Sequence, residues 1–204
     1  MKLTIIGASG HGKVVADIAE KNGYNEIDFL DDYKFANPEC IQSCGKWPIV
    51  GKTDNAENID EDLFIAIGNS QTRKIFMERY ADKHIVTLIH PNAIIASGVK
   101  IGRGTTIMAG VVINSGTKIG NGCIINTSSS IDYDCIIGDY SHIAVGTNLA
   151  GTVEVGKCTW IGAGATVIDN IKICDECMIG TGSVIVKDIT EAGTYVGIPA
   201  RKIK

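Results

Sequence analysis

The sequence IASGVKIGRGTTIMAGVVI, residues 95–113, decides the fold of the second half of this chain. An aliphatic residue returns in it every six positions, and the spacing continues without a shift to Ile185. Sixteen consecutive positions keep to it: Ile95, Ile101, Ile107, Ile113, Ile119, Ile125, Ile131, Ile137, Ile143, Leu149, Val155, Ile161, Val167, Ile173, Ile179 and Ile185. A period held this long indicates a solenoid built from hexapeptide repeats.

Small residues accompany the aliphatic one in each repeat. Glycine often follows it directly, as at Gly102 and Gly120, and the position two before it is small or β-branched, as at Thr105 and Cys123. We expect each short strand to bury one aliphatic side chain, while the glycine lets the chain turn. Three hexads close one triangular coil, so the repeats predict about five coils with residue i near residue i+18. A β-sandwich is disfavoured, because its period is two and it needs hairpin turns.

The composition bounds the class of protein. The chain has 204 residues, 45% of them hydrophobic and 21% charged, with a net charge of −4, which excludes a disordered tail and a basic nucleic-acid binder. No apolar run is long enough to span a membrane, and the N-terminus reaches Gly7 too early for a signal peptide, so we expect a cytoplasmic protein without membrane insertion. The seven cysteines are expected to be reduced. Cys174 and Cys177 form a lone C-x-x-C that we interpret as core filler, and no metal site is expected.

The first half of the chain has the order strand, glycine turn, helix. Residues 3–6 are a short apolar run, residues 7–13 a glycine-rich turn, and apolar residues then recur at helical spacing through residue 19. We predict further strands at 27–30, 63–68 and 85–89, a helix near 69–81, and a long loop over 32–51, which lacks periodicity. This order predicts a Rossmann-like βαβ nucleotide-binding unit.

The glycine turn and the end of the second strand form a candidate ligand site. The G-x-x-G-x-G spacing of residues 7–12 offers backbone N–H groups and a helix N-terminus to a phosphate, and Asp31 and Asp32 are suited to accept hydrogen bonds from a ribose or base. The spacing is not G-x-G-x-x-G, which disfavours NAD. Two alternatives stay open. His11 is either an exposed, solvated imidazole or a ligand contact, and the acidic pair is either a polar strand end or a substrate contact.

The whole chain resembles one family of sugar acyltransferases. The resemblance lies in GASGHG (residues 7–12), FLDD (29–32), IHP (89–91), the hexads, and VGIPAR (196–201). These motifs are similar to those of the sialic-acid O-acetyltransferase type, which includes N-acetyltransferases acting on nucleotide-linked 4-amino sugars. The resemblance implies an α/β Rossmann-like domain over residues 1–89, a left-handed parallel β-helix over 90–187 and a tail over 188–204. It also implies a homotrimer that binds acetyl-CoA between neighbouring solenoids and a nucleotide sugar on the N-terminal domain.

The resemblance also implies residue roles. It places the nucleotide sugar against Ser9, Gly10, His11, Asp31, Asp32, Gly51 and Asn126. His142 matches the position that hydrogen-bonds the thioester region of acetyl-CoA. Gly151, Ala163 and Thr181 match positions that contact the pantetheine arm, mainly through backbone groups.

One position departs from the family pattern. The family's catalytic base is a histidine in a hydrophobic-acid-His-acid-Cys stretch and is supported by the acid after it, but here the stretch reads Ile131-Asp132-Tyr133-Asp134-Cys135. A free phenol titrates near ~10, about three units too high for an easy base at neutral pH. Three alternatives remain: another residue such as His142 or Asp134 compensates, the amine arrives neutral and needs little base, or the chain binds without turnover.

The expected function is acetyl-CoA-dependent N-acetylation of the amino group of a nucleotide-linked amino sugar, of the UDP-4-amino-sugar type, in surface-glycan or glycoprotein biosynthesis. Sugar O-acetylation is the nearest alternative. A catalytically impaired nucleotide-sugar or CoA binder is a second, favoured by Tyr133. A purely structural solenoid is a third, which the glycine turn and the acidic pair argue against, because neither serves solenoid packing.

Overall fold

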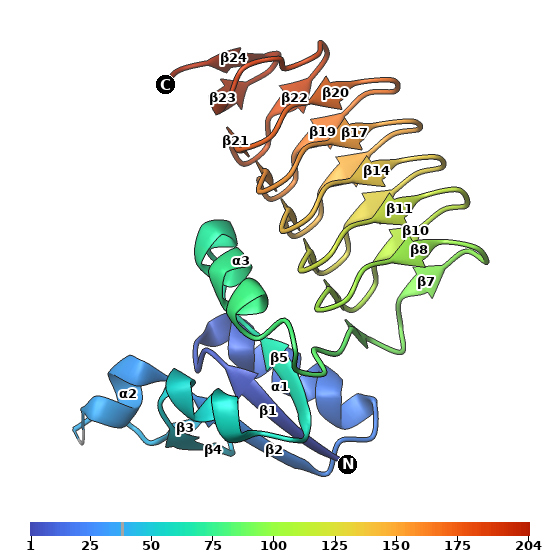
Figure 1. Cartoon of the computed structure of the whole chain (residues 1–204). Helices are drawn as coiled ribbons and strands as arrows, with labels where there is room; N and C mark the ends of the chain where they lie inside the picture. The colour runs from blue at the N-terminus through green and yellow to red at the C-terminus, as the bar shows by residue number, and fades with distance from the viewer. Residues whose placement is uncertain (38) are drawn as a thin grey trace. The chain divides into compact units, whose positions relative to one another are not determined.

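The computed structural model describes residues 1–37 and 39–204. The chain divides into two compact units, residues 1–89 and 90–204, and the ribbon in Figure 1 is coloured along the chain so that each can be followed. The first unit is an α/β domain, and the second is a parallel β-helix that ends in a short antiparallel pair.

The first unit is built on a five-stranded sheet in the order β3-β4-β2-β1-β5. Its pairings are parallel except for the hairpin of β3 and β4. The five strands of this sheet are β1 (Lys2–Ile6), β2 (Glu26–Leu30), β3 (Ser43–Cys44), β4 (Trp47–Gly51) and β5 (Asp62–Ile65). The helices of the unit are α1 (Gly10–Lys21), α2 (Asp32–Ala36), the 3-10 helix η1 (Thr53–Asn58) and α3 (Ser70–Arg79), and the short strand β6 (Leu88–Ile89) ends the unit. The predicted Rossmann-like order of strand, turn and helix is confirmed.

The turn between β1 and α1 depends on two glycines. Gly7 has φ +105°, a conformation that side chains rarely adopt. A Cβ on Gly12 would strike the Gly7 carbonyl oxygen and lie 3.0 Å from the Phe29 ring. The turn therefore lets α1 begin directly against the sheet, with its first N–H groups at the end of β1.

The expectation of a long loop over residues 32–51 is wrong. The segment forms α2, then the β3–β4 hairpin, whose second strand pairs with β2. The sequence of α2 has no periodic apolar pattern, because this helix has five residues and none of them is buried. The first strand of the hairpin, β3, has only two residues, which is too short for such a pattern. Pro38, within this segment, lies outside the described residues. The predicted last strand at 85–89 is also shorter, since only an isolated bridge at Ile85 precedes β6.

The second unit consists of three sheets, each holding one strand from every coil (Figure 1). The first sheet contains β7 (Ile94–Ile95), β10 (Val112–Ile113), β13 (Ser130–Ile131), β16 (Asn148–Leu149), β19 (Thr166–Val167) and β22 (Val184–Ile185). The second sheet contains β8 (Lys100–Ile101), β11 (Lys118–Ile119), β14 (Ile136–Ile137), β17 (Glu154–Val155) and β20 (Lys172–Ile173). The third sheet contains β9 (Thr106–Ile107), β12 (Ile124–Ile125), β15 (His142–Ile143), β18 (Trp160–Ile161), β21 (Cys177–Ile179), β23 (Gly193–Gly197) and β24 (Ala200–Lys202). Strands of successive coils pair in parallel, and from β7 to β22 the register is 18 residues, as predicted.

The core of the β-helix follows the hexad. From Ile107 to Ile185 every sixth residue is buried, whereas Ile95 and Ile101 in the first coil are half-buried. Small buried side chains fill the interior beside them, and their hydroxyls join the coils. Thr105, for example, donates to the Gly120 carbonyl at 2.8 Å and accepts from the Cys123 N–H at 3.0 Å.

The glycine that directly follows the aliphatic residue does not have the role we expected. Gly102 and its equivalents have no left-handed φ. A Cβ on Gly102 would lie 2.5 Å from the Gly120 carbonyl carbon of the next coil, so glycine is needed here for close approach. The chain turns instead three residues after the aliphatic position, where φ is positive in every hexad from 98 to 182. Seven of these corners are not glycine: Ser128, Asp134, Tyr140, Thr152, Cys158, Asn170 and Glu176.

The residues expected to form a tail, 188–204, belong to the second unit. β23 continues the third sheet, and β24 pairs with it in the antiparallel direction. Within residues 1–37 and 39–204, no helix is long and apolar enough to cross a membrane.

Candidate functional site

Asp31 ties the glycine turn to the end of β2. One carboxylate oxygen accepts the Ala8 N–H at 3.0 Å, and the other accepts the Lys34 N–H at 2.9 Å as the N-cap of α2. A carboxylate that holds two backbone N–H groups keeps a fixed orientation. The structure therefore brings Ser9, Gly10 and Asp31 to one place.

Asp32 is engaged by the protein itself. Its Oδ1 accepts the Thr53 N–H at 2.8 Å, and both oxygens lie within 3.0 Å of the Thr53 hydroxyl. Gly51 lies beside this pair, and its carbonyl accepts the Asp31 N–H at 3.0 Å. A Cβ on Gly51 would lie 2.8 Å from the Asn55 amide oxygen, so a side chain there would disturb the start of η1.

Two cavities meet at Ser9, Asp31 and Tyr33, which line both. The first, of about 590 Å³, also has Lys13 and Lys34 in its wall, and the first turn of α1 contributes Gly10. The second, of about 390 Å³, is more apolar and reaches from Asp32 and Thr53 to Leu30, Ile67 and Phe76. Cations and open helix N–H groups suit phosphates, and an apolar slot with a few polar groups suits a flat base.

Sequence reasoning missed Lys13 and Lys34. A signal was available for both: Lys13 follows the glycine turn directly, and Lys34 follows the acidic pair within one turn of helix. Both lie near the buried Cys44 thiol, whose pKa burial raises and the two ammonium groups partly lower again.

His11 is not the exposed, solvated imidazole that we kept as an alternative. Burial, and secondarily the Arg73 guanidinium, lowers its pKa from 6.5 to about 4, so the ring is neutral at pH 7. Its Nε2 is buried and has no hydrogen-bond partner among the described residues. Arg73 itself is buried and donates to the Ile67 and Gly68 carbonyls at 2.7 and 2.8 Å. The ring does not line either cavity.

Tyr133 lies on the backbone of the next coil. A Cβ on Gly151 would overlap the Tyr133 ring, at 2.6 Å from the phenol oxygen and 2.7 Å from Cε2. The tyrosine stays 48% exposed. The structure therefore places side by side two residues to which the resemblance gives different roles: Tyr133 at the position of the catalytic base and Gly151 at a position that contacts the pantetheine arm.

Asp134 points the other way along the stack. It occupies a left-handed corner with φ +54°, and its Oδ1 lies where a Cβ on Gly116 of the preceding coil would stand. Tyr133 leans toward the following coil, so this carboxylate and the phenol diverge.

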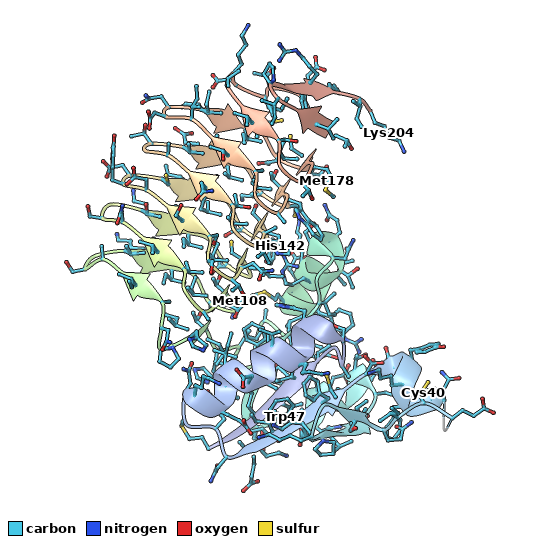
Figure 2. The ribbon with its side chains drawn as sticks, turned by 180° about the vertical axis from the view of Figure 1, so that it is seen from behind. Cys40, Trp47, Met108, His142, Met178 and Lys204 are labelled. Carbon is cyan, nitrogen blue, oxygen red and sulfur yellow. The ribbon has the colours of Figure 1, made fainter. Side chains whose placement is uncertain are left out.

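His142 lies on the third sheet, between Ile124 of β12 and Trp160 of β18. Figure 2 shows it partway along the solenoid, between the labelled Met108 and Met178. Its ring packs on Trp160 with centroids 4.5 Å apart, and its Nε2 is 3.1 Å from the Asn126 amide nitrogen. The structure thus brings Asn126 and His142 together. Tyr133 follows β13 of the first sheet, on a different side of the coil.

The backbone groups of the expected pantetheine positions are partly engaged within the chain. The Gly151 N–H donates to the Asp169 carboxylate at 3.0 Å, and its carbonyl accepts the Asn170 N–H. The Ala163 carbonyl accepts the Gly182 N–H at 2.9 Å. Thr181 is exposed on the turn after β21.

The cysteines of the β-helix differ in burial, and Cys174, which we interpreted as core filler, is only half-buried. Cys123, Cys135 and Cys177 are buried, and all seven are free thiols. The Sγ atoms of Cys174 and Cys177 lie 3.4 Å apart. Burial, and secondarily the neighbouring Cys174 thiol, raises the pKa of Cys177 to about 12. Among the residues that the structure describes, no group of three or more His, Cys, Asp or Glu side chains is placed to hold a metal ion.

Comparisons with known proteins match both units. Residues 2–80 match the PglD N-terminal domain, and residues 86–115 and 152–187 match the bacterial transferase hexapeptide model of six repeats. A curated relative, UDP-N-acetylbacillosamine N-acetyltransferase of Bacillus subtilis, is 36% identical over 109 residues, which are 52% of this chain and 50% of that protein.

Two solved structures match almost the whole chain. The acetyltransferase domain of PglB from Neisseria gonorrhoeae is 35% identical with a TM-score of 0.92, covering 99% of both chains, and the same domain has been solved with acetyl coenzyme A. PerB from Caulobacter crescentus, in complex with CoA and GDP-perosamine, is 32% identical with a TM-score of 0.90, covering 100% of this chain and 98% of that one. The resemblance seen in the sequence is therefore confirmed, and the chain belongs to the sialic-acid O-acetyltransferase type of sugar acyltransferases, which join a PglD-type N-terminal domain to a left-handed hexapeptide β-helix.

Proposed function

We propose that this chain is an acetyl-CoA-dependent N-acetyltransferase acting on the amino group of a nucleotide-linked amino sugar of the UDP-4-amino-sugar type, in surface-glycan or glycoprotein biosynthesis. The observation that carries the proposal is the match over 99% of the chain to an acetyltransferase domain solved with acetyl coenzyme A. The match to PerB, solved with CoA and a nucleotide-linked sugar, supports the substrate class.

The reaction has a simple balance. The sugar amine attacks the thioester carbonyl, a C–N bond forms, the C–S bond breaks and CoA leaves as a thiol after the amine gives up a proton. We infer that the nucleotide binds at Ser9, Gly10, Asp31 and Asp32, because two cavities meet there beside an open helix N-terminus and two lysines. Acetyl-CoA binding at His142, Gly151, Ala163 and Thr181 is part of the same proposal and rests on the resemblance.

Assembly and location belong to the proposal as well. We infer a homotrimer, since Tyr133 and His142 lie on different sides of one coil and meet only if a second chain supplies one of them. Exposed apolar residues on the coils, among them Ile136, Val145, Trp160 and Met178, favour such burial between chains. We propose a cytoplasmic location, where acetyl-CoA is available.

A second candidate function is binding of the nucleotide sugar and CoA without turnover, and Tyr133 favours it. The Tyr133 ring lies against Gly151, and the Asp134 carboxylate points toward Gly116 on the preceding coil. No imidazole stands at this position to take up the amine proton.

A thiol-release assay tests the proposal. The chain is mixed with acetyl-CoA and a panel of UDP- and GDP-linked amino sugars, with the corresponding hydroxyl sugars as controls for O-acetylation. We expect thiol release with an amino sugar, and an N-acetyl product that is about 42 Da heavier than the amino sugar because an acetyl group replaces one hydrogen. Binding of both ligands by calorimetry without thiol release would establish the second candidate instead.

A further inference from the structure

Cys174 and Cys177 form a pair of thiols at the corner of the β-helix between β20 and β21. Their Sγ atoms lie 3.4 Å apart, so the two side chains already face each other in the reduced protein. A disulfide bond is about 2.0 Å long, and bond formation therefore requires the two sulfurs to approach by about 1.4 Å.

The backbone of both cysteines is held by neighbouring coils. The Cys174 N–H donates to the Ile189 carbonyl at 2.9 Å, and the Cys177 N–H donates to the Thr159 hydroxyl at 3.1 Å. The Cys177 thiol also lies 3.7 Å from the Glu191 carbonyl oxygen. Ile189 follows the pair in the stack and Thr159 precedes it, so the stacking of the coils sets the distance between the two cysteines.

The two thiols differ in their access to solvent. Cys174 is half-buried and lines a cavity of about 550 Å³ over the second sheet, whereas Cys177 is 2% exposed. A cavity of about 300–1,000 Å³ suits a small molecule, and the ammonium groups of Lys157 and Lys172 in the wall suit carboxylates. Burial raises the pKa of Cys177, which keeps this thiol protonated. Cys174 is therefore the sulfur that reacts first.

The face that carries this cavity is charged. Strands alternate inward and outward side chains, and in the second sheet the outward residue is charged in four strands: Lys100, Lys118, Glu154 and Lys172. The centres of subunit interfaces are depleted in charged residues. This face is therefore suited to solvent, and Cys174 stays reachable in the homotrimer that we propose.

We propose that Cys174 and Cys177 are a reversible dithiol–disulfide pair that exchanges with low-molecular-weight disulfides of the glutathione type. The Cys174 thiolate attacks one sulfur of the reagent, a mixed disulfide forms, and the other half leaves as a thiolate that takes up the proton released from Cys174. Cys177 then attacks the Cys174 sulfur, the internal disulfide forms, and the second half leaves with the proton of Cys177. The two cysteines together lose two electrons and two protons, and the reagent gains both.

The position of the pair gives the exchange a structural consequence. Cys177 is the first residue of β21 and lies opposite Gly193 of β23, and Thr181 follows this strand. An internal disulfide would fix the start of β21 covalently. Redox state would thereby act on the segment that leads to one of the proposed pantetheine positions. This consequence rests on the proposed function, whereas the exchange itself does not.

The test reads the state of the two sulfurs in one peptide. Trypsin cleavage after Lys172 and Lys187 releases residues 173–187, which contain Cys174 and Cys177 and no other cysteine. The folded full-length chain is incubated with glutathione disulfide, quenched with acid, unfolded, alkylated with N-ethylmaleimide and digested for mass spectrometry. We expect a peptide with an internal disulfide and no alkyl group, and a peptide with two alkyl groups after dithiothreitol. A peptide that keeps two alkylated cysteines in glutathione disulfide, or stays a mixed disulfide, would overturn the proposal.

Single variants test the order of the two steps. Cys177→Ser removes the resolving thiol, so glutathione should stay attached to Cys174. In Cys174→Ser the remaining thiol is buried and should react at least about tenfold more slowly. Cys158→Ser replaces another half-buried cysteine, on the preceding coil, and should leave the internal disulfide unchanged. Equal reaction rates of Cys174 and Cys177 in the two single variants would refute the order.

The peptide measurement does not depend on acetyl transfer. If a variant does not fold, the state of peptide 173–187 from the unmodified protein decides alone. An internal disulfide in a chain without thiol release from acetyl-CoA would contradict the proposed function and leave the thiol pair standing. Thiol release with a peptide that never forms the disulfide would have the opposite meaning.

Discussion

Replacing Gly151 by Ala should force the Tyr133 ring off the next coil. The new Cβ would stand 2.6 Å from the phenol oxygen and 2.7 Å from Cε2, both shorter than real Cβ contacts, and the backbone of Gly151 has no left-handed φ that would add strain. Tyr133 is 48% exposed, so about half of its surface is buried. An aromatic side chain buries about 150–250 Å², and half of that at about 25 cal/mol per Å² gives about 2–3 kcal/mol as an upper estimate of the free energy lost.

The double-mutant cycle isolates this contact. We expect Gly151→Ala to lower the free energy of unfolding by about 1–2.5 kcal/mol in urea titrations, and to have an effect below about 0.5 kcal/mol when Tyr133→Ala is already present. The Gly151 N–H keeps its bond to Asp169 in both variants, so loss of that bond does not contribute. Equal destabilisation in both backgrounds would refute the reasoning, because the cost would then come from the glycine itself and not from the ring.

Four further outcomes are expected. Tyr133→His should raise the acetyl-transfer rate by at least about 10²-fold, since it supplies an imidazole base; a variant no faster than the original would refute a missing base. Asp32→Ala should weaken nucleotide-sugar binding in calorimetry and leave acetyl-CoA affinity unchanged, and equal losses would contradict two separate sites. Because the folded-state pKa of His11 is lowered from 6.5 to about 4, its neutral form stabilises the fold fully above pH 6.5, and stability should fall by roughly 2 kcal/mol between pH 6.5 and 5. His11→Gln should flatten that slope in urea titrations, and an unchanged slope would assign it to other groups. Light scattering at micromolar concentration should give three times the 21.7 kDa chain mass, and a monomer would contradict the trimer.

The sequence was most informative where one physical requirement repeats. Each hexad must bury one aliphatic side chain, so the requirement is repeated sixteen times from Ile95 to Ile185, and the strand register and the core follow from it. The glycine after the aliphatic position misled us, because composition alone does not separate a residue needed for turning from one needed for close approach. The structure separates them by φ and by the 2.5 Å contact at Gly102.

The parts of the site that escaped prediction depend on contacts between distant residues. The β3–β4 hairpin is too short for a periodic signal, yet it places Cys44 in the cavity wall beside Lys13. The bond between Asn126 and His142 spans 16 residues and depends on which way an amide faces, and the Thr127 N–H, which donates to the amide oxygen, decides that. No pattern of residue types encodes such an orientation.

The 18-residue register makes the β-helix a molecular ruler. Parallel strands lie about 4.8 Å apart, so each coil adds that length to the stack, and positions that differ by multiples of 18 residues fall on one straight line. Duplicating one coil, for instance residues 151–168, would keep every strand pairing and buried side chain in phase and move Thr181 about 4.8 Å farther from His142. If the pantetheine arm of acetyl-CoA runs between His142 and Thr181, as we propose, inserting one coil should make the β-helix fit an acyl carrier with a correspondingly longer arm.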